Sequence, residues 1–249
     1  MGSYLLFRLF GPMAAWGDIA VGERRHVFPQ PTKSAILGLI AGSIGLRRTD
    51  EGQLAALHAG YGFASRVDAP GRLLTDFHTA QMPPASAVKR ANGFRTRREE
   101  LSIRRSELET VLSYRDYHAD ALAIACVWPL EKAPYSLDQL ADALRRPVFA
   151  PYLGRRSCSP ALPFSPYIAE ANSPTEALRK ATFPDDNVLD RIATGGTRSY
   201  YWEGESADDM KPLQTLRRRD VARSRIQWQF AERSEHHAVE ERSNVPEQD

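Results

Sequence analysis

The spacing of apolar residues near the start of the chain predicts a buried strand followed by a glycine-rich helix. Residues 4–10 form an apolar run with β-favouring side chains, and a Gly-Pro pair directly after it ends the strand. In residues 31–46 apolar side chains recur at the spacing of one helix face, and Thr32 or Ser34 can cap the first turn. The glycines within this helix allow close backbone approach, so we expect it to pack tightly against a sheet.

The middle of the chain predicts three further strands and a second helix. Residues 61–67 and 72–79 predict a hairpin, because the Asp-Ala-Pro-Gly segment between them supplies turn dihedrals. Residues 121–128 form another apolar strand, which a proline ends. The helix predicted over residues 136–145 begins at Ser136, a favoured N-cap residue, and has leucine and alanine side chains on one face.

This order of elements is the skeleton of a ferredoxin-like or RRM-like domain, so the predicted fold class is α+β, with that domain over residues 1–150. Residues 82–113 interrupt the skeleton with polar, arginine-rich sequence, and we expect them to project as an inserted thumb hairpin. Short strand-like pieces in residues 151–233 predict a smaller, mainly β lobe. Residues 234–249 are polar and contain no aromatic side chain, which predicts a disordered acidic tail.

Charge is distributed unevenly along a chain that is nearly neutral overall. The 249 residues carry a net charge of +2, and 42% are hydrophobic, as in an ordinary globular protein. Residues 89–105 contain seven basic and two acidic residues, and residues 211–225 contain six basic residues and one acidic one. Such segments indicate a localised site for a polyanion, although a basic run can also be a solvated surface.

Cysteine count and hydropathy exclude several classes of protein. Two cysteines cannot build a disulfide framework or a four-ligand zinc site. No run approaches the ~18 apolar residues of a membrane span, and no basic region precedes the first apolar run as in a signal peptide. The sequence therefore predicts a cytoplasmic protein that has no membrane partner, no metal and no other cofactor.

Three motifs connect the chain to a known family. The first is YLLFRLFGPMAAWG at residues 4–17, followed by FP at 28–29 and PTKSAILGLI at 31–40. The second is YLGRRSCSP at residues 152–160, and the third is the arginine-rich segment at residues 217–231. In this order they resemble the CasD family of type I-E CRISPR Cascade subunits. Two departures are the Ala-Ala pair at residues 14–15, where relatives often have glutamine, and the long acidic end.

The resemblance implies an RRM-like palm and a thumb hairpin that together hold the 5′ handle of the CRISPR RNA in antiviral defence. Such a subunit is non-catalytic and caps one end of the filament of backbone subunits. The implied partners are the CRISPR RNA, a CasC-like backbone subunit and a large CasA-like subunit. The thumb of the family also displaces one nucleotide of the guide–target duplex, which places a target DNA strand near residues 82–113.

The first candidate RNA contacts surround the glycine-rich helix. Lys33 and Ser34 begin this helix, where backbone N–H groups and the helix dipole favour a phosphate, although the pair can also be an ordinary cap with a solvated lysine. Arg24, Arg25 and His26 lie in the preceding loop and can line the same groove or stay in an exposed loop. The thumb adds further candidates, namely Arg95, Arg97, Arg98, Arg104 and Arg105.

The second motif supplies the remaining candidate contacts. Arg155 and Arg156 follow Gly154 in a turn, and Tyr152 beside them offers a face on which a base can stack. A single-stranded handle requires phosphate neutralisation and stacking more than readout of a groove. We therefore expect this turn and the helix start at Lys33 to lie close in space and to hold the handle together.

An RNA-cleaving enzyme is the alternative from a different functional class. The resemblance extends to type I-C relatives, some of which cleave the precursor RNA with a tyrosine, lysine and histidine group. This chain offers Tyr114, Tyr117 and His118, and also His78 after a strand. However, Asp116 stands where a cation would stabilise the developing phosphorane charge, and no lysine accompanies the histidine. We therefore predict no catalytic residues. A third functional class, a scaffold that binds only proteins, would require the basic segments to be buried against acidic partners.

Overall fold

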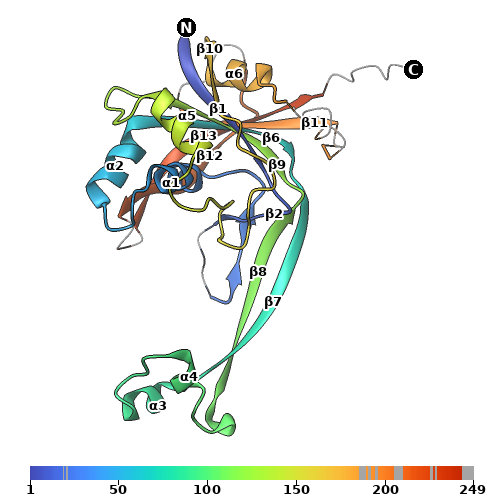
Figure 1. Ribbon diagram of the computed structural model, residues 1–249. Coiled ribbons are helices and arrows are strands. Elements are labelled where there is room, and N and C mark those ends of the chain that lie inside the picture. Colours follow the sequence, from blue (N-terminus) through green and yellow to red (C-terminus); the bar gives the residue numbers. More distant parts are fainter. Residues whose placement is uncertain are drawn as a thin grey trace.

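The computed structural model describes residues 1–18, 20, 22–184, 189, 192–193, 196–204, 210–224, 227 and 229–242. Seven strands form its main sheet: β1 (Gly2–Phe10), β6 (Tyr61–Ala69), β9 (Leu122–Pro129), β10 (Tyr167–Ala171), β11 (Thr197–Trp202), β12 (Gln214–Ser224) and β13 (Gln229–Glu241). Their order is β10-β1-β9-β6-β11-β13-β12, and every neighbouring pair is antiparallel (Figure 1). The protein is therefore a mixed α+β structure built on antiparallel strands.

Helices cover both faces of this sheet (Figure 1). They are α1 (Lys33–Ile44), α2 (Glu51–Gly60), α5 (Leu137–Arg145) and α6 (Pro174–Lys180). Alternate side chains of β1 belong to two cores: Leu5 and Phe7 pack with α1, α2 and α5, whereas Tyr4 and Leu6 pack with α6. Because both faces are buried, this strand is apolar from Tyr4 to Phe10 except for Arg8, which is itself buried. No helix in the described part of the chain is long and apolar enough to cross a membrane.

Two of the helices begin where the sequence predicts. The Thr32 side chain accepts a hydrogen bond from the Ala35 N–H and caps α1, which ends at Gly45 in the left-handed region with φ of 98°. Ser136 caps α5 through a capping box with Gln139. Helix α2 was not predicted, although it begins after Asp50, a favoured N-cap residue. In the structure the Asp50 side chain accepts from the Arg47 N–H instead of capping the helix.

A long two-stranded ribbon projects from the body of the molecule (Figure 1). It consists of β7 (Arg72–Met82) and β8 (Glu109–Ala119), which pair along their whole length. Between them lie α3 (Ala85–Arg90), α4 (Arg97–Glu100) and the short helix η1 (Arg105–Glu107). We call residues 72–119 the arm. The predicted insertion at residues 82–113 covers only its outer part.

The predicted hairpin between residues 61–67 and 72–79 is wrong. Strand β6 pairs with β9 and β11 in the main sheet, whereas β7 pairs with β8 in the arm. Every residue of β6 is buried, so this strand requires neighbours on both edges. Gly71 makes the change of direction possible because its φ of 73° suits glycine and a Cβ there would collide with the Ala119 carbonyl.

The C-terminal part of the chain extends the main sheet instead of forming a separate lobe. Strands β11, β12 and β13 continue the sheet beyond β6, and β10 flanks β1 at the other edge. The disorder predicted from residue 234 is wrong for residues 234–241, which lie in β13 with Glu235 and Ala238 buried. This strand was not recognised in the sequence, because polar side chains on its solvent-exposed face alternate with the side chains on its other face. Residues 243–249 of the predicted tail lie outside the described residues.

Candidate nucleic-acid interface

The base of the arm is held by the segment that follows β1. Within this segment lie four short strands: β2 (Met13–Ala14), β3 (Trp16–Gly17), β4 (Arg24–Arg25) and β5 (Val27–Phe28). Strand β2 pairs with the inner end of β8, and β4 runs parallel to β8 with Arg24 opposite Tyr114. These pairings place the basic loop, residues 24–26, against the arm.

A buried carboxylate fixes the side chains of this loop. Asp116 is 2% exposed and accepts hydrogen bonds from Thr75 Oγ1 at 2.7 Å and from Arg24 Nε at 3.3 Å. His26 Nδ1 lies 3.0 Å from the same carboxylate. Thr75 lies directly opposite Asp116 in the β7–β8 ladder, so the arm itself positions the acid.

Asp116 remains ionised in this position. Burial alone would raise its pKa, but hydrogen bonds from Thr75 and Arg24, the charge of Arg24 and the hydrogen bond with His26 outweigh burial and hold the pKa below its usual value. A charged Asp116 in turn orients Arg24, whose side chain stays about half exposed. The guanidinium is thus fixed in position while part of its surface remains accessible.

The predicted RNA-contacting turn meets the basic loop at the same place. Arg155 donates from Nη1 to the Asp116 carbonyl at 2.9 Å and from Nη2 to the Arg25 carbonyl at 3.1 Å. Its guanidinium carbon lies 4.8 Å from the centre of the Tyr117 ring. Gly154 permits this approach because its φ is 87° and a Cβ would collide with the Ala15 carbonyl. Two segments more than a hundred residues apart are therefore joined.

We call five basic residues of these two segments the arm-root cluster: Arg24, Arg25, His26, Arg155 and Arg156. Arg24 and Arg155 are built into the fold by the contacts above, whereas Arg25 and Arg156 are exposed. Guanidinium groups pair bidentately with phosphate oxygens, and Asp116 is the carboxylate that balances part of the charge. The arrangement can bind a phosphate backbone.

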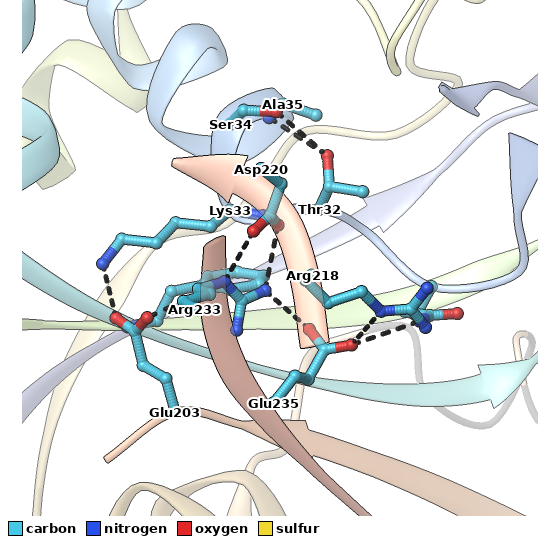
Figure 2. A network of polar contacts seen from close by, with 11 residues as sticks. Thr32, Lys33, Ser34, Ala35, Glu203, Arg218, Asp220, Arg233 and Glu235 are labelled. Atoms are coloured by element: carbon cyan, nitrogen blue, oxygen red, sulfur yellow. Dashed lines mark hydrogen bonds and ion pairs between the residues drawn. The ribbon is translucent and has the colours of Figure 1, made fainter. Parts of the chain in front are cut away.

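The structure does not support Lys33 as a phosphate contact (Figure 2). Its side chain is buried, with Nζ 2.5 Å from Glu203 Oε1, and its backbone N–H donates to Asp220 Oδ2 at 2.8 Å. The N-terminus of α1, where we expected a phosphate, therefore already holds a carboxylate of β12. The pairing of Lys33 with Asp220 could not be predicted, because the two residues are 187 positions apart in the sequence.

One arginine of the second basic segment, Arg218, is also paired with a carboxylate inside the protein. Arg218 donates to Glu235 at 2.8 Å, and its guanidinium lies 4.2 Å from the centre of the Phe28 ring. Arg233 pairs with Asp220 at 2.7 Å and with Glu235 at 2.6 Å (Figure 2). A buried network of alternating charges thus ties β12 and β13 to α1.

The remaining predicted contacts fall in two separate places. Ser34 lines a pocket together with Tyr152 and Gly154. The prediction that the helix start and the turn lie close together is therefore confirmed at Ser34. The arginines of the arm lie instead around α4 and η1, at the end of the arm away from the body (Figure 1). Arg97 is engaged there with Glu100 at 2.6 Å. Contacts from the arm to RNA stay a prediction.

The residues considered for catalysis do not converge. Tyr117 and His118 are consecutive in β8, so their side chains point to opposite faces of the strand, and both are buried. Burial also lowers the pKa of His118. Tyr114 packs instead against Phe77, with ring centres 5.0 Å apart. Among the described residues, no group of His, Cys, Asp and Glu side chains has the arrangement of a metal site.

The organising roles of Asp116 and Thr75 were missed from the sequence. Asp116 was considered only as an obstacle to catalysis. The two-residue period of a strand places it on the same face as Tyr114 and His118, which is the signal that could have drawn attention to it. Its partner Thr75 could not be found, because the pairing of β7 with β8 was not predicted.

Comparison with known proteins gives consistent matches over most of the chain. A family model described as CRISPR-associated protein (Cas_Cas5) matches residues 4–235. The CRISPR system Cascade subunit CasD of Escherichia coli (strain K12) is 33% identical over 178 residues, covering 72% of this chain and 76% of that protein. A chain of a solved CRISPR RNA-guided surveillance complex aligns with a TM-score of 0.65 and 26% identity, over 96% of this chain and 90% of its own.

A crystal structure of a Cas protein shares the fold, with a TM-score of 0.57 and 23% identity over 95% of this chain and 94% of its own. The family match includes both the motif at residues 4–17 and the turn at residues 152–160 that supplies two of the five residues of the arm-root cluster. The predicted resemblance to CasD is therefore confirmed. The chain belongs to the CRISPR-associated Cas5 family.

Proposed function

We propose that this protein is the Cascade subunit that holds the 5′ handle of the CRISPR RNA, and that it does so at the arm-root cluster. The observation that carries the proposal is the meeting of the loop at residues 24–26 with the turn at residues 152–156 beside the arm. The similar protein from E. coli is a Cascade subunit, and a similar solved chain belongs to an RNA-guided complex. Both likenesses support a role with guide RNA.

The chemistry of the cluster suits single-stranded RNA. Arg25 and Arg156 are exposed and can pair with phosphates, while Tyr152 is 43% exposed and can stack on a base. Double-stranded RNA is recognised mainly by shape along a helix, whereas this cluster is a compact group of side chains where two short segments meet. A short, bent single strand therefore fits it better than a duplex.

We also infer that the body is a ferredoxin-like, RRM-like palm. The strand order β10-β1-β9-β6, with α1 before β6 and α5 before β10, follows the β-α-β-β-α-β pattern of that fold. The arm is then an insertion between the second and third strands of the pattern. Its position beside the cluster is consistent with a thumb that meets the target DNA strand. The subunit as a whole would then cap a filament of CasC-like subunits beside a CasA-like subunit.

The proposed role is non-catalytic. Tyr117 is covered by the guanidinium of Arg155, and the buried His118 faces the opposite side of the strand. A proton transfer to RNA requires an acid or base within hydrogen-bond reach of the scissile phosphate. These positions offer no shared surface on which such a phosphate could lie.

The proposal is tested by the binding of two RNAs to the complex that contains this chain. One RNA carries the 5′ handle copied from the repeat of the host's CRISPR array, and the other lacks it. We expect the handle to increase affinity by about a hundred-fold, the effect of two charge-assisted phosphate contacts. Equal affinity for the two RNAs would show that the handle is not bound.

A cleavage assay with repeat RNA tests the absence of catalysis. Repeat RNA incubated with the purified chain, with and without divalent metal, is expected to remain intact on a denaturing gel. A variant with His118→Ala serves as the control. Cleavage at one site by the wild type, lost in that variant, would contradict the non-catalytic proposal.

A further inference from the structure

Strand β12 lies at one edge of the main sheet and carries a row of exposed arginines. It pairs with β13 on one side, and in the described part of the chain no strand pairs with its other side. Arg217, Arg219 and Arg223 are exposed, and the Arg217 side chain is 85% exposed. We call these three residues the edge arginines. None of them belongs to the arm-root cluster, so the proposed RNA contact does not account for them.

The residues between the edge arginines attach the strand to the body. Asp220 accepts a hydrogen bond from the Lys33 N–H at the start of α1 at 2.8 Å, and Ser224 donates to Glu51 Oε1 of α2 at 2.6 Å. Ala222 between them is buried. One set of side chains thus fixes β12 to the two helices, while the edge arginines stay exposed between these fixed points.

The edge arginines are only weakly engaged within the protein. Arg219 Nε donates to the Phe230 carbonyl at 3.3 Å, and this neutral acceptor leaves the charge of the guanidinium uncompensated. Arg217 lies 3.6 Å from the carboxylate of Glu232, whose side chain is itself 58% exposed. An exposed ion pair of this kind contributes little stability, so Arg217 can exchange Glu232 for another anion. The row therefore presents positive charge to the solvent.

The use of arginine in this row points to a phosphate backbone. Charge on an edge strand also discourages pairing with other strands, but lysine is the usual residue in that role. Guanidinium groups bind phosphate oxygens bidentately. Surfaces for single strands add aromatic side chains on which bases stack, whereas β12 contains no aromatic residue. Phosphate contacts without stacking suit a duplex, in which the bases are paired inside and the phosphates face outward.

A protein partner fits this strand less well. Interfaces between proteins have an apolar core with few charged residues, whereas protein–DNA interfaces are polar and strongly positive. The exposed residues of β12 are Gln214, Thr215 and the edge arginines, so its exposed surface is entirely polar or basic.

We propose that the edge arginines bind the phosphate backbone of double-stranded DNA and form a second nucleic-acid surface, separate from the RNA site. The contacts are to phosphates alone, so binding does not depend on the DNA sequence. The surface shares no residue with the arm-root cluster and does not require the proposed RNA contact. Only the choice of DNA over duplex RNA rests on the proposed function, which brings target DNA to this subunit.

The experiment measures the binding of a short fluorescent DNA duplex to the purified chain, with and without saturating handle RNA. The combined variant Arg217→Ala, Arg219→Ala and Arg223→Ala is expected to lower duplex affinity about ten-fold or more. The slope of log affinity against log salt should also fall by about 2–3, since each phosphate contact contributes about 0.9 to it. Handle RNA should bind this variant as tightly as it binds the wild type.

Two further variants separate the effect of the row from folding and from total charge. Lys132→Ala, Arg146→Ala and Lys180→Ala combined remove three exposed positive charges outside β12 and should leave duplex affinity near the wild-type value. Glu232→Gln removes the acid that competes for Arg217 and should raise duplex affinity about two- to five-fold, the strength of an exposed ion pair. Unfolding cannot produce such a gain.

The outcomes separate this inference from the proposed function. Equal duplex affinity in the two triple variants, with handle RNA still bound, would contradict the DNA surface and leave the proposed function standing. Failure of the wild-type chain to bind handle RNA, with duplex affinity still dependent on the edge arginines, would do the reverse. Tighter binding of an RNA duplex of the same sequence would overturn the choice of DNA. Self-association of the edge variant at unchanged duplex affinity would show that the arginines protect the edge of the sheet and that the inference is wrong.

Discussion

Replacing Arg25 and Arg156 with alanine together is expected to lower the affinity for handle RNA by about a hundred-fold. Each residue is exposed in the arm-root cluster and can make a charge-assisted phosphate contact, which contributes about 1.5–3 kcal/mol. Because 1.4 kcal/mol corresponds to a factor of ten, two lost contacts at the lower end of this range give about two orders of magnitude. The salt dependence should also flatten, since fewer counterions are released on binding.

Arg25 and Arg156 are chosen because their loss leaves the fold intact. Arg24 and Arg155 bind Asp116 through its side chain and its backbone, so their removal would disturb the base of the arm as well as the RNA site. Lys180→Ala with Lys211→Ala is the matched control, since it removes the same charge from exposed positions outside the cluster. Equal affinity and equal salt dependence in the two double variants would contradict the assignment of the cluster.

Arg233→Ala is expected to lower the free energy of unfolding by about 3–5 kcal/mol, the effect of removing one partner from a buried ion pair. The Arg233 side chain is 7% exposed and lies among Asp220, Glu203 and Glu235 (Figure 2). Burial by itself would lower its pKa, but the hydrogen bond and charge of Asp220 and the neighbouring carboxylates raise it. Without this arginine, buried negative charge beside the start of α1 loses its main counter-charge.

Urea unfolding of the purified chain measures this effect, with Arg217→Ala as the control. Arg217 is 85% exposed on the same strand as Asp220, and its ion pair with Glu232 has a length of 3.6 Å. Exposed pairs contribute less than about 1 kcal/mol, so this variant should unfold almost like the wild type. Similar unfolding midpoints for Arg233→Ala and Arg217→Ala would show that the network does not hold the sheet to α1.

Elements with local signals could be predicted from the sequence. The strand at β1 and the helices α1 and α5 have apolar patterns and caps within a few residues of each other, so their prediction needed no tertiary information. The partner of β7 could not be predicted in this way. A turn between β6 and β7 is consistent with a hairpin, and only the burial of both faces of β6 decides against it.

The candidate site shows the same limit. Arg155 and the loop at residues 24–26 were identified by their chemistry and by family motifs, and they meet in the structure. Lys33 was equally suitable by its chemistry, but carboxylates at positions 203 and 220 occupy it. Residue type and local spacing cannot distinguish an arginine that faces a ligand from a lysine that is paired across the fold.

The central claim, that this chain holds a defined 5′ handle of guide RNA, is tested most directly by recovering its natural RNA. The wild-type chain is purified with its co-expressed Cascade subunits, and the 5′ ends of the RNA that accompanies it are sequenced. We predict a single sequence shared by the 5′ ends of all these RNAs, derived from the repeat and followed by varied guide sequences. RNAs with unrelated 5′ ends, or a complex that contains no RNA, would contradict the account.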